Sequence, residues 1–126
     1  MTLPFVHNSD VPRVTVLIID DHEGFRSSAR TLLEADGYRV VGEAGDGMSG
    51  LRLAAELRPD VVLVDVELPD IDGFDVAARL ATGEGPQVVL ISSREFGGGG
   101  AAERSGARGF VPKDELSGEA LAAVLR

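Results

Sequence analysis

The chain has 126 residues, of which 44% are hydrophobic and 26% are charged, so it is long and apolar enough for one domain with a buried core. Its net charge is 12 − 21 = −9, which argues against direct contact between this segment and nucleic acid. The sequence has no cysteine, which excludes disulfides and thiolate metal sites and suits a cytoplasmic location. No apolar run has the length of a membrane span, so we expect no membrane contact.

Residues 1–12, MTLPFVHNSDVP, precede the first predicted strand. They lack the basic start and the apolar stretch of a signal peptide. We therefore expect residues 1–12 to form a flexible extension that ends at Pro12, and residues 13–126 to form a single domain.

The first half of this domain alternates twice between strand and helix. A continuous apolar run predicts a strand at Val14–Ile19, and apolar residues at helical spacing then predict a helix that stops at Gly37. A second strand is expected at Tyr38–Val41. It is followed by a helix over Gly47–Arg58, which Pro59 ends.

The second half continues the same alternation. Val61–Val64 predicts a strand that is covered on both faces, and Gly73–Ala81 predicts the next helix. Further strands are expected at Val88–Ile91 and Gly109–Val111. The last helix is predicted to begin at Asp114, which is a favourable N-cap residue.

Four consecutive glycines, Gly97–Gly100, stand where a helix should follow the fourth strand. Each glycine inside a helix costs about 1 kcal/mol relative to alanine, so we expect this fourth helix to be short or frayed. The region from Phe96 to Ser105 should then be the most mobile part of the chain outside its termini.

Strand and helix alternating five times in one chain is typical of an open, doubly wound α/β fold. We expect a flavodoxin-like, five-stranded parallel sheet of order 2-1-3-4-5 with helices on both faces. Ligands bind such sheets at the carboxyl ends of the strands, where the strand order reverses. In this order the reversal lies between the first and third strands.

Carboxylates follow both of those strands. Asp20 and Asp21 end the first strand and Asp65 ends the third, so three carboxylates should share one pocket. Like charges this close require a cation if all are to stay ionised. Oxygen ligands without histidine or cysteine nearby favour Mg²⁺ or a similar hard ion.

A hydroxyl and an ammonium group are expected at the same edge. Ser92 ends the fourth strand, and Lys113 follows the fifth. Carboxylates, a divalent cation, a hydroxyl and a lysine together suit a phosphoryl group, and a carboxylate could be the nucleophile that forms an acyl phosphate.

Four segments carry a family resemblance in the right order: VLIIDDHEGFR, VVLVDVELPDIDGFD, VVLISS and GARGFVPKD. From Arg13 to Arg126 the chain resembles the receiver domain of bacterial two-component response regulators. His22 and the pair Lys113-Asp114 look most like the NarL/LuxR-type subgroup, whose members carry a helix-turn-helix output domain. In contrast to many members of the family, Asp114 rather than proline follows Lys113.

The resemblance implies a role for each acidic residue. Asp65 would accept a phosphoryl group from a histidine kinase, which is the implied partner. Mg²⁺ would be bound directly by Asp21 and Asp65, largely through water by Asp20, and by the backbone carbonyl of Glu67. The domain would catalyse only its own phosphotransfer and dephosphorylation, and so would not be an enzyme with a separate substrate.

The resemblance also implies a switch. Ser92 would hydrogen-bond the phosphoryl oxygens, Lys113 would pair with them, and Phe110 would turn inward as Ser92 moves. Such a switch would control a homodimer or a C-terminal DNA-binding domain outside this sequence, and through it transcription. A plain core position remains the alternative for Phe110.

Two other functions share this fold and some of these residues. An aspartate-nucleophile phosphatase would want a second aspartate two residues after Asp65, where this chain has Glu67. A phosphorylation-independent module (a pseudo-receiver) would be expected to have lost Asp21, Asp65 or Lys113, and all three are present. His22 is predicted to be structural, and Glu67 with Arg94 is predicted to be either a surface pair or a control on water access.

Overall fold

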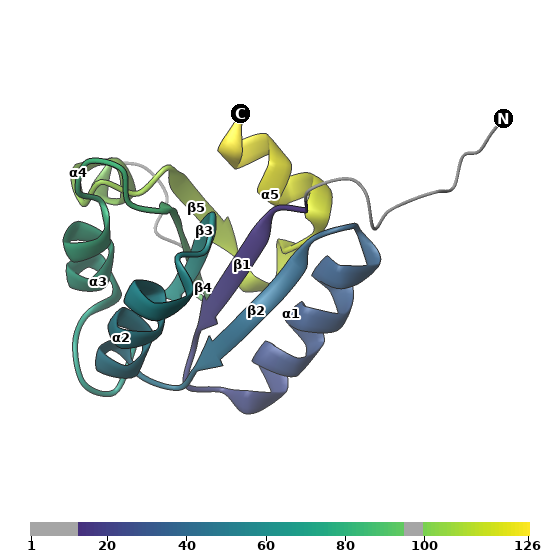
Figure 1. Ribbon diagram of the computed structural model, residues 1–126, viewed down its shortest axis with the longest axis horizontal. Helices are drawn as coiled ribbons and strands as arrows, with labels where there is room; N and C mark the ends of the chain where they lie inside the picture. Colours follow the sequence, from purple (N-terminus) through teal and green to yellow (C-terminus); the bar gives the residue numbers. More distant parts are fainter. Residues whose placement is uncertain (1–12, 95–99) are drawn as a thin grey trace, which may run out of the picture.

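The computed structural model describes residues 13–94 and 100–126. The five strands are β1 (Thr15–Ile19), β2 (Arg39–Ala44), β3 (Val61–Asp65), β4 (Gln87–Ser92) and β5 (Gly109–Pro112). All neighbouring strands are parallel, in the order β2-β1-β3-β4-β5, so the predicted sheet is confirmed (Figure 1). This order places the carboxyl end of β1 beside that of β3.

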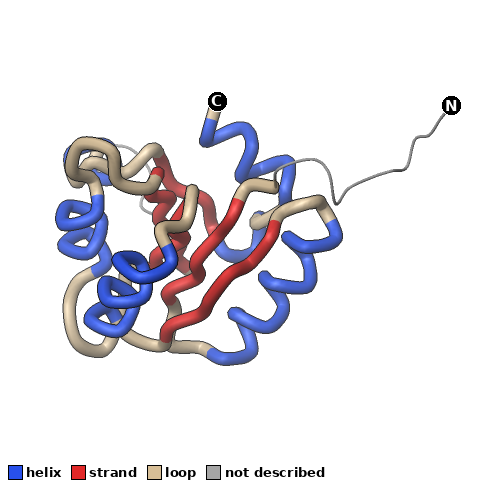
Figure 2. The backbone as a smooth tube through the Cα atoms, viewed as in Figure 1, coloured by secondary structure: helices blue, strands red, loops and turns tan. Residues whose placement is uncertain are grey.

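Helices cover both faces of the sheet (Figure 2). The helices are α1 (Glu23–Ala35), α2 (Gly47–Leu57), α3 (Gly73–Leu80), α4 (Ala101–Arg104) and α5 (Gly118–Leu125), with a 3₁₀ turn at Lys113–Glu115. α1 and α5 lie on one face, and α2 and α3 lie on the other (Figure 1). Within the described residues, no helix is both long enough and apolar enough to span a membrane.

Alternating side chains of the central strands form two apolar layers. In β1, Val16 and Ile18 face α1 and α5, whereas Leu17 and Ile19 face α2 and α3, and all four are fully buried. A strand that is buried on both faces needs apolar residues at every position, which explains the continuous apolar runs of the sequence.

The last helix begins later than predicted. Asp114 lies in the 3₁₀ turn and does not cap a helix, and α5 starts at Gly118 after Ser117, whose Oγ accepts a hydrogen bond from the Ala120 N–H at 2.9 Å. Leu116 between them is extended and buried against the α1–α5 face. The chain therefore places this side chain in the core before the helix can begin.

The predicted short fourth helix is confirmed, since α4 has four residues, none of them buried. It starts after Gly100, whose φ of +69° is a left-handed conformation that favours glycine. The predicted extension at residues 1–12, and residues 96–99 of the segment predicted to be mobile, lie outside the described residues.

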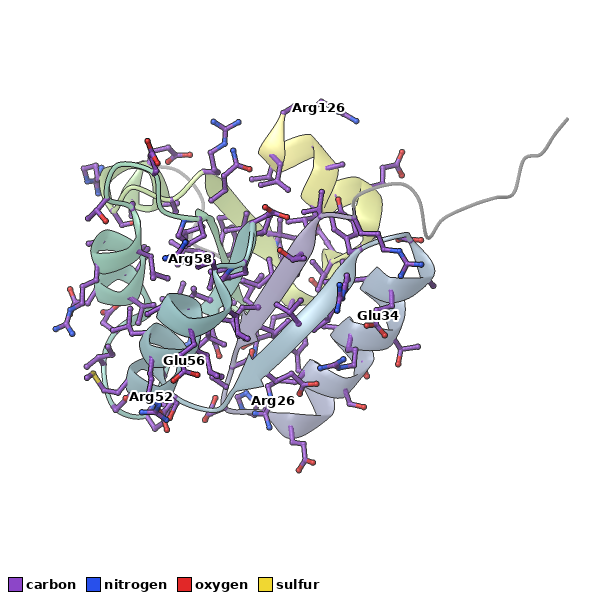
Figure 3. The ribbon with its side chains drawn as sticks, viewed as in Figure 1. Arg26, Glu34, Arg52, Glu56, Arg58 and Arg126 are labelled. Carbon is purple, nitrogen blue, oxygen red and sulfur yellow. The ribbon has the colours of Figure 1, made fainter. Side chains whose placement is uncertain are left out.

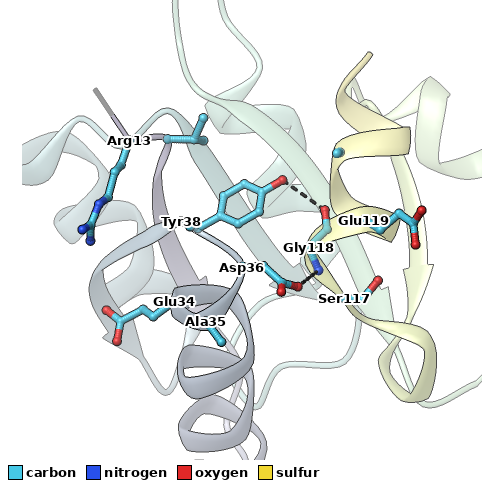
Figure 4. Close-up of a pocket in the computed structure, with 11 residues that line it drawn as sticks. Arg13, Glu34, Ala35, Asp36, Tyr38, Ser117, Gly118 and Glu119 are labelled. Atoms are coloured by element: carbon cyan, nitrogen blue, oxygen red, sulfur yellow. Dashed lines mark hydrogen bonds between the residues drawn. The ribbon is translucent and has the colours of Figure 1, made fainter. Parts of the chain in front are cut away.

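Where α1 ends and β2 begins, polar groups join α1 to α5 (Figure 4). The Tyr38 hydroxyl donates a hydrogen bond to the Gly118 carbonyl at 3.2 Å, and the Gly118 N–H donates to Asp36 Oδ2 at 2.8 Å. A Cβ atom on residue 118 would lie 2.4 Å from the Cβ of Asp36, so only glycine fits here without a shift. This contact fixes the start of α5 against the end of α1.

Candidate functional site

The structure brings two strand-ending carboxylates into one buried place. Asp20 follows β1 with no exposed surface, and Asp65 ends β3 with 3% of its surface exposed. The backbone N–H of His22 donates to Asp20 Oδ1 at 2.8 Å, and that of Glu67 donates to Asp65 Oδ1 at 3.1 Å. Each loop after a strand thus orients the carboxylate that precedes it.

Lys113 lies between these carboxylates. Its Nζ is 2.6 Å from Asp20 Oδ2 and 3.2 Å from Asp65 Oδ2, and it also lies 4.8 Å from the centre of the Phe25 ring. Burial acts to lower the pKa of Lys113, but Asp20 and Asp65 outweigh burial and the pKa is raised. The ammonium therefore stays charged and ties the end of β5 to the ends of β1 and β3.

One ammonium does not balance the carboxylates of the site. Burial and, to a lesser degree, the charge of Asp20 raise the pKa of Asp65, although the Glu67 N–H and Lys113 act to lower it. Oδ2 of Asp20 is buried and, among the described residues, meets no donor with hydrogen-bond geometry, although Lys113 pairs with its charge. Carboxylate oxygens that lack donors are ligands suited to a hard divalent cation.

Asp21 and His22 lie at the mouth of this acidic site. Asp20, Asp21, His22 and Asp65 each offer a ligand atom, and these atoms all lie within 4.8 Å of one another. Nδ1 of His22 is 3.1 Å from Asp20 Oδ1, 3.2 Å from Asp21 Oδ1 and 3.4 Å from Lys113 Nζ.

The expectation that no histidine lies near the carboxylates is therefore wrong. The imidazole of His22 is largely exposed and contacts the acidic cluster directly. The signal was present in the chain, because His22 follows Asp20 and Asp21 directly and the first turn of α1 holds these residues together.

Ser92 and Phe110 occupy the neighbouring strands. Ser92 ends β4 in register with Pro112 of β5, and its buried Oγ accepts a hydrogen bond from the Arg94 N–H at 3.0 Å. Phe110 is half-buried and packs against the core on the face covered by α2 and α3. Ser92 thus lies at the same edge of the sheet as Asp65 and Lys113, one strand away from each.

Glu67 and Arg94 lie outside the buried part of the site. Their side chains approach to 3.5 Å, and both are more than half exposed. This is the geometry of a surface ion pair beside the acidic site. The carbonyl of Glu67 as a metal ligand remains a prediction.

Comparisons with known proteins agree with this architecture. Residues 16–125 match the model of the response regulator receiver domain family. The signal receiver domain of NarL from Mycobacterium tuberculosis superposes with a TM-score of 0.81 at 38% identity, over 91% of this chain and 95% of that one. The response regulator domain of Thermotoga maritima CheB has a TM-score of 0.79 at 26% identity, over 90% and 95% of the two chains.

Curated relatives are longer than this chain. BvgA of Bordetella pertussis, named as a transcription regulator of virulence factors, is 41% identical over 102 residues, which are 79% of this chain and 49% of BvgA. The transcriptional regulatory protein LiaR of Bacillus subtilis is 39% identical over 82 residues, 64% of this chain and 39% of LiaR. The chain spans about half the length of the first of these relatives. With its fold, its acidic strand ends and this match over residues 16–125, the chain belongs to the response regulator receiver domain family and is similar to its NarL/LuxR-type members.

Proposed function

We propose that this domain accepts a phosphoryl group on Asp65 from a histidine kinase, in a reaction that depends on Mg²⁺. The observation that carries the proposal is the placement of Asp65, buried at the end of β3, in contact with Lys113 and beside Asp20 and Asp21. A carboxylate that is raised in pKa and surrounded by further acids is costly to keep unless its chemistry is used.

In the proposed transfer, a carboxylate oxygen of Asp65 forms a bond to phosphorus as the phosphorus–nitrogen bond of the kinase phosphohistidine breaks. The electron pair of the breaking bond returns to the imidazole. Lys113 then pairs with the phosphoryl oxygens, and the hydroxyl of Ser92 donates to one of them.

The donor set fits Mg²⁺, because carboxylate oxygens predominate in the cluster, its ligand atoms all lie within 4.8 Å of one another, and a single ammonium serves both Asp20 and Asp65. Asp20, Asp21 and Asp65 would hold the ion, with the Glu67 carbonyl as a further ligand. When bound, the ion supplies positive charge to the phosphoryl oxygens. Asp20 and Asp21 provide the negative charge that attracts the ion to this site, and Lys113 orients the carboxylate of Asp65.

The relatives indicate the output. BvgA and LiaR are named as transcription regulators, and this chain matches less than half of each. We therefore propose that residues 13–126 are a receiver domain that acts in the cytoplasm and controls a DNA-binding domain outside this sequence. Ser92 and Phe110 would carry the change at Asp65 to the surface formed by α4, β5 and α5.

Phosphorylation by acetyl phosphate with Mg²⁺ tests the transfer. Intact-mass measurement should show one added phosphoryl group, which hydroxylamine removes as expected for an acyl phosphate. Asp65→Asn should abolish the addition, whereas Asp75→Asn, which changes an exposed carboxylate of α3, should retain it. Undiminished labelling of Asp65→Asn would refute the assignment.

A change of association tests the switch. We expect a weak monomer–dimer equilibrium that shifts when beryllofluoride, a mimic of the phosphoryl group, is added. Sedimentation with and without beryllofluoride over a wide range of concentrations measures that shift. Identical mass distributions would remove the dimer and leave the phosphotransfer.

A further inference from the structure

Two arginines of α1 hold one glutamate of β2, next to the acidic site. Nε of Arg26 lies 3.1 Å from Glu43 Oε1, and Nε of Arg30 lies 2.8 Å from Glu43 Oε2. Arg26 lies near the start of α1, where β2 also ends (Figure 3). The hydrogen bond from Arg30, followed by that from Arg26, lowers the pKa of Glu43, so the glutamate is a stable anion between two cations.

Arg26 makes one contact that Arg30 does not. Its NH1 donates a 2.6 Å hydrogen bond to the backbone carbonyl of Asp20. The backbone N–H of the same Asp20 donates to the Ala44 carbonyl at 2.9 Å. The peptide groups on both sides of Asp20 are therefore tied to the end of β2, one directly and the other through Arg26 and Glu43.

Arg30 provides a natural comparison. Besides Glu43, Arg30 contacts the Val40 carbonyl at 3.3 Å and the Glu34 carboxylate at 3.6 Å, both away from the acidic loop. The two arginines thus make similar contributions to the pairing of α1 with β2. They differ in whether they touch the loop that carries Asp20, Asp21 and His22.

The Asp20–His22 loop contains groups that repel one another. Asp20 and Asp21 are like charges, and Asp20 is fully buried. His22, at the N-cap position of α1, makes no capping hydrogen bond with its side chain. Repulsion between the carboxylates would spread the loop outward, and the bond from Arg26 to the Asp20 carbonyl opposes that movement.

We propose that Arg26 is a positioning residue for cation binding, held in place by Glu43, and this inference rests on the proposed function. Arg26 keeps the Asp20–His22 loop at the spacing at which its carboxylates can share one ion with Asp65. Residues that orient metal ligands from behind typically change metal affinity 10- to 100-fold when they are removed. We therefore expect Arg26→Met to weaken Mg²⁺ binding by about 10-fold or more.

The test compares Arg26→Met with Arg30→Met in the 126-residue chain without phosphorylation. Titration calorimetry measures the Mg²⁺ affinity, and urea unfolding without metal measures stability. Both variants lose a bond to Glu43, and Arg26→Met also loses the bond to the Asp20 carbonyl, so it should lose somewhat more stability; only Arg26→Met should lose Mg²⁺ affinity. Equal affinities in Arg26→Met and the parent, or equal losses in both variants, would overturn the proposal.

Arg26→Lys serves as the conservative variant and also replaces Arg26→Met if the latter fails to fold. A single ammonium cannot span the carboxylate of Glu43 and the carbonyl of Asp20 as the two arginine nitrogens do. We expect an affinity between those of the parent and Arg26→Met, and parental affinity in this variant would contradict the role. Absence of Mg²⁺ binding by the parent itself would refute the cation part of the proposed function. If instead the parent binds Mg²⁺ and Arg26→Met binds it equally well, only the role of Arg26 is refuted.

Discussion

Two pairs of aspartates, one at each end of the sheet, have opposite surroundings. At the amino end, Asp60 accepts hydrogen bonds from the N–H of Thr15 at 2.9 Å and from its hydroxyl at 3.0 Å, and Asp36 accepts one from Gly118. At the carboxyl end, Asp20 and Asp65 are buried and share the single ammonium of Lys113. Asp60 and Asp36 thus meet hydrogen-bond donors and, among the described residues, no neighbouring acid, whereas the buried Asp20 and Asp65 each accept one backbone N–H and lie beside each other with one ammonium between them.

The difference shows where this fold gives up stability. A partly solvated carboxylate that accepts backbone N–H groups stabilises the elements it joins. A buried carboxylate beside another acid destabilises the folded state unless a cation joins them. The aspartates at the amino end therefore stabilise the fold. The buried carboxylates at the carboxyl end are available to a ligand, but they lower the stability of the folded state.

The largest expected effect comes from Gly73, at the start of α3. A Cβ atom on residue 73 would lie 2.2 Å from the Asp65 carbonyl oxygen and 2.7 Å from the Val66 Cα, which are backbone atoms that cannot turn aside. We expect Gly73→Ala to lower the free energy of unfolding by about 3 kcal/mol, the upper part of the range for overpacking.

Gly118→Ala is the matched change at the amino end. Its Cβ would lie 2.4 Å from the Cβ of Asp36, which rotation of that side chain does not move, so the end of α1 and the start of α5 must shift apart and we expect a loss of about 2 kcal/mol. Urea unfolding of both variants measures the two losses. Equal losses would mean that the carboxyl end is no more rigid than the amino end.

The next effect tests the donors at the amino end. Asp60→Ala removes the acceptor of two hydrogen bonds from Thr15, which lies 45 residues away in the chain at the start of β1. We expect a loss of about 1–2 kcal/mol in the free energy of unfolding. Thr15→Val also removes two hydrogen bonds, because the hydroxyl donates to Asp60 Oδ2 and accepts from the Asp60 N–H at 2.9 Å, so we expect a loss of similar size. An unchanged free energy of unfolding in both variants would show that these hydrogen bonds do not stabilise the amino end.

Asp65→Asn should have the opposite sign. Burial, followed by the charge of Asp20, raises the pKa of Asp65, so its ionised form destabilises the folded state at neutral pH. The neutral amide removes that cost, and we expect Asp65→Asn to unfold at higher urea than the parent without metal.

The gain should depend on pH. As the pH falls through the raised pKa of folded Asp65, the parent becomes neutral at this site too, and the gain disappears below the usual value of 3.8. Urea unfolding in a series of increasingly acidic buffers measures this. A variant that is less stable than the parent at neutral pH would show that Lys113 more than compensates Asp65.

The smallest effect belongs to the surface pair beside the site. Glu67 and Arg94 are 3.5 Å apart and mostly exposed, and such pairs contribute less than about 1 kcal/mol. Arg94→Ala should therefore leave the unfolding midpoint nearly unchanged. A clear loss of stability would show that the Arg94 side chain has a structural role beyond this pair.

Much of the fold could be predicted because its signals are periodic. The apolar runs located all five strands, although β2 continues to Ala44, beyond the predicted end at Val41. Gly42 and Glu43 hid that extension, since neither is apolar. The start of α5 was placed too early because Asp114 is a favourable cap residue, whereas burial of Leu116 delays the helix to Gly118.

The site was predictable to the extent that strand ends carry it. Asp20, Asp65, Ser92 and Lys113 follow from strand order alone, because parallel strands bring their carboxyl ends to one edge. The contact of His22 could have been inferred from its place directly after Asp20 and Asp21, whereas Arg26 reaches from α1 back to the loop and across to β2. No spacing rule within one element reports the contacts of Arg26.

Lys113 also allows selective chemical labelling. It is the single lysine of the sequence, and the other 11 of its 12 Lys and Arg residues are arginines. Amine-directed reagents can therefore acylate only this side chain and the amino terminus. While Lys113 pairs with Asp20 and Asp65, its pKa is raised and only a small fraction of its amine is deprotonated and reactive. A ligand that separates Lys113 from these carboxylates will therefore change the rate of labelling. The chain thus contains its own single-residue reporter, whose acylation rate follows the state of the acidic site without an added dye or an engineered cysteine.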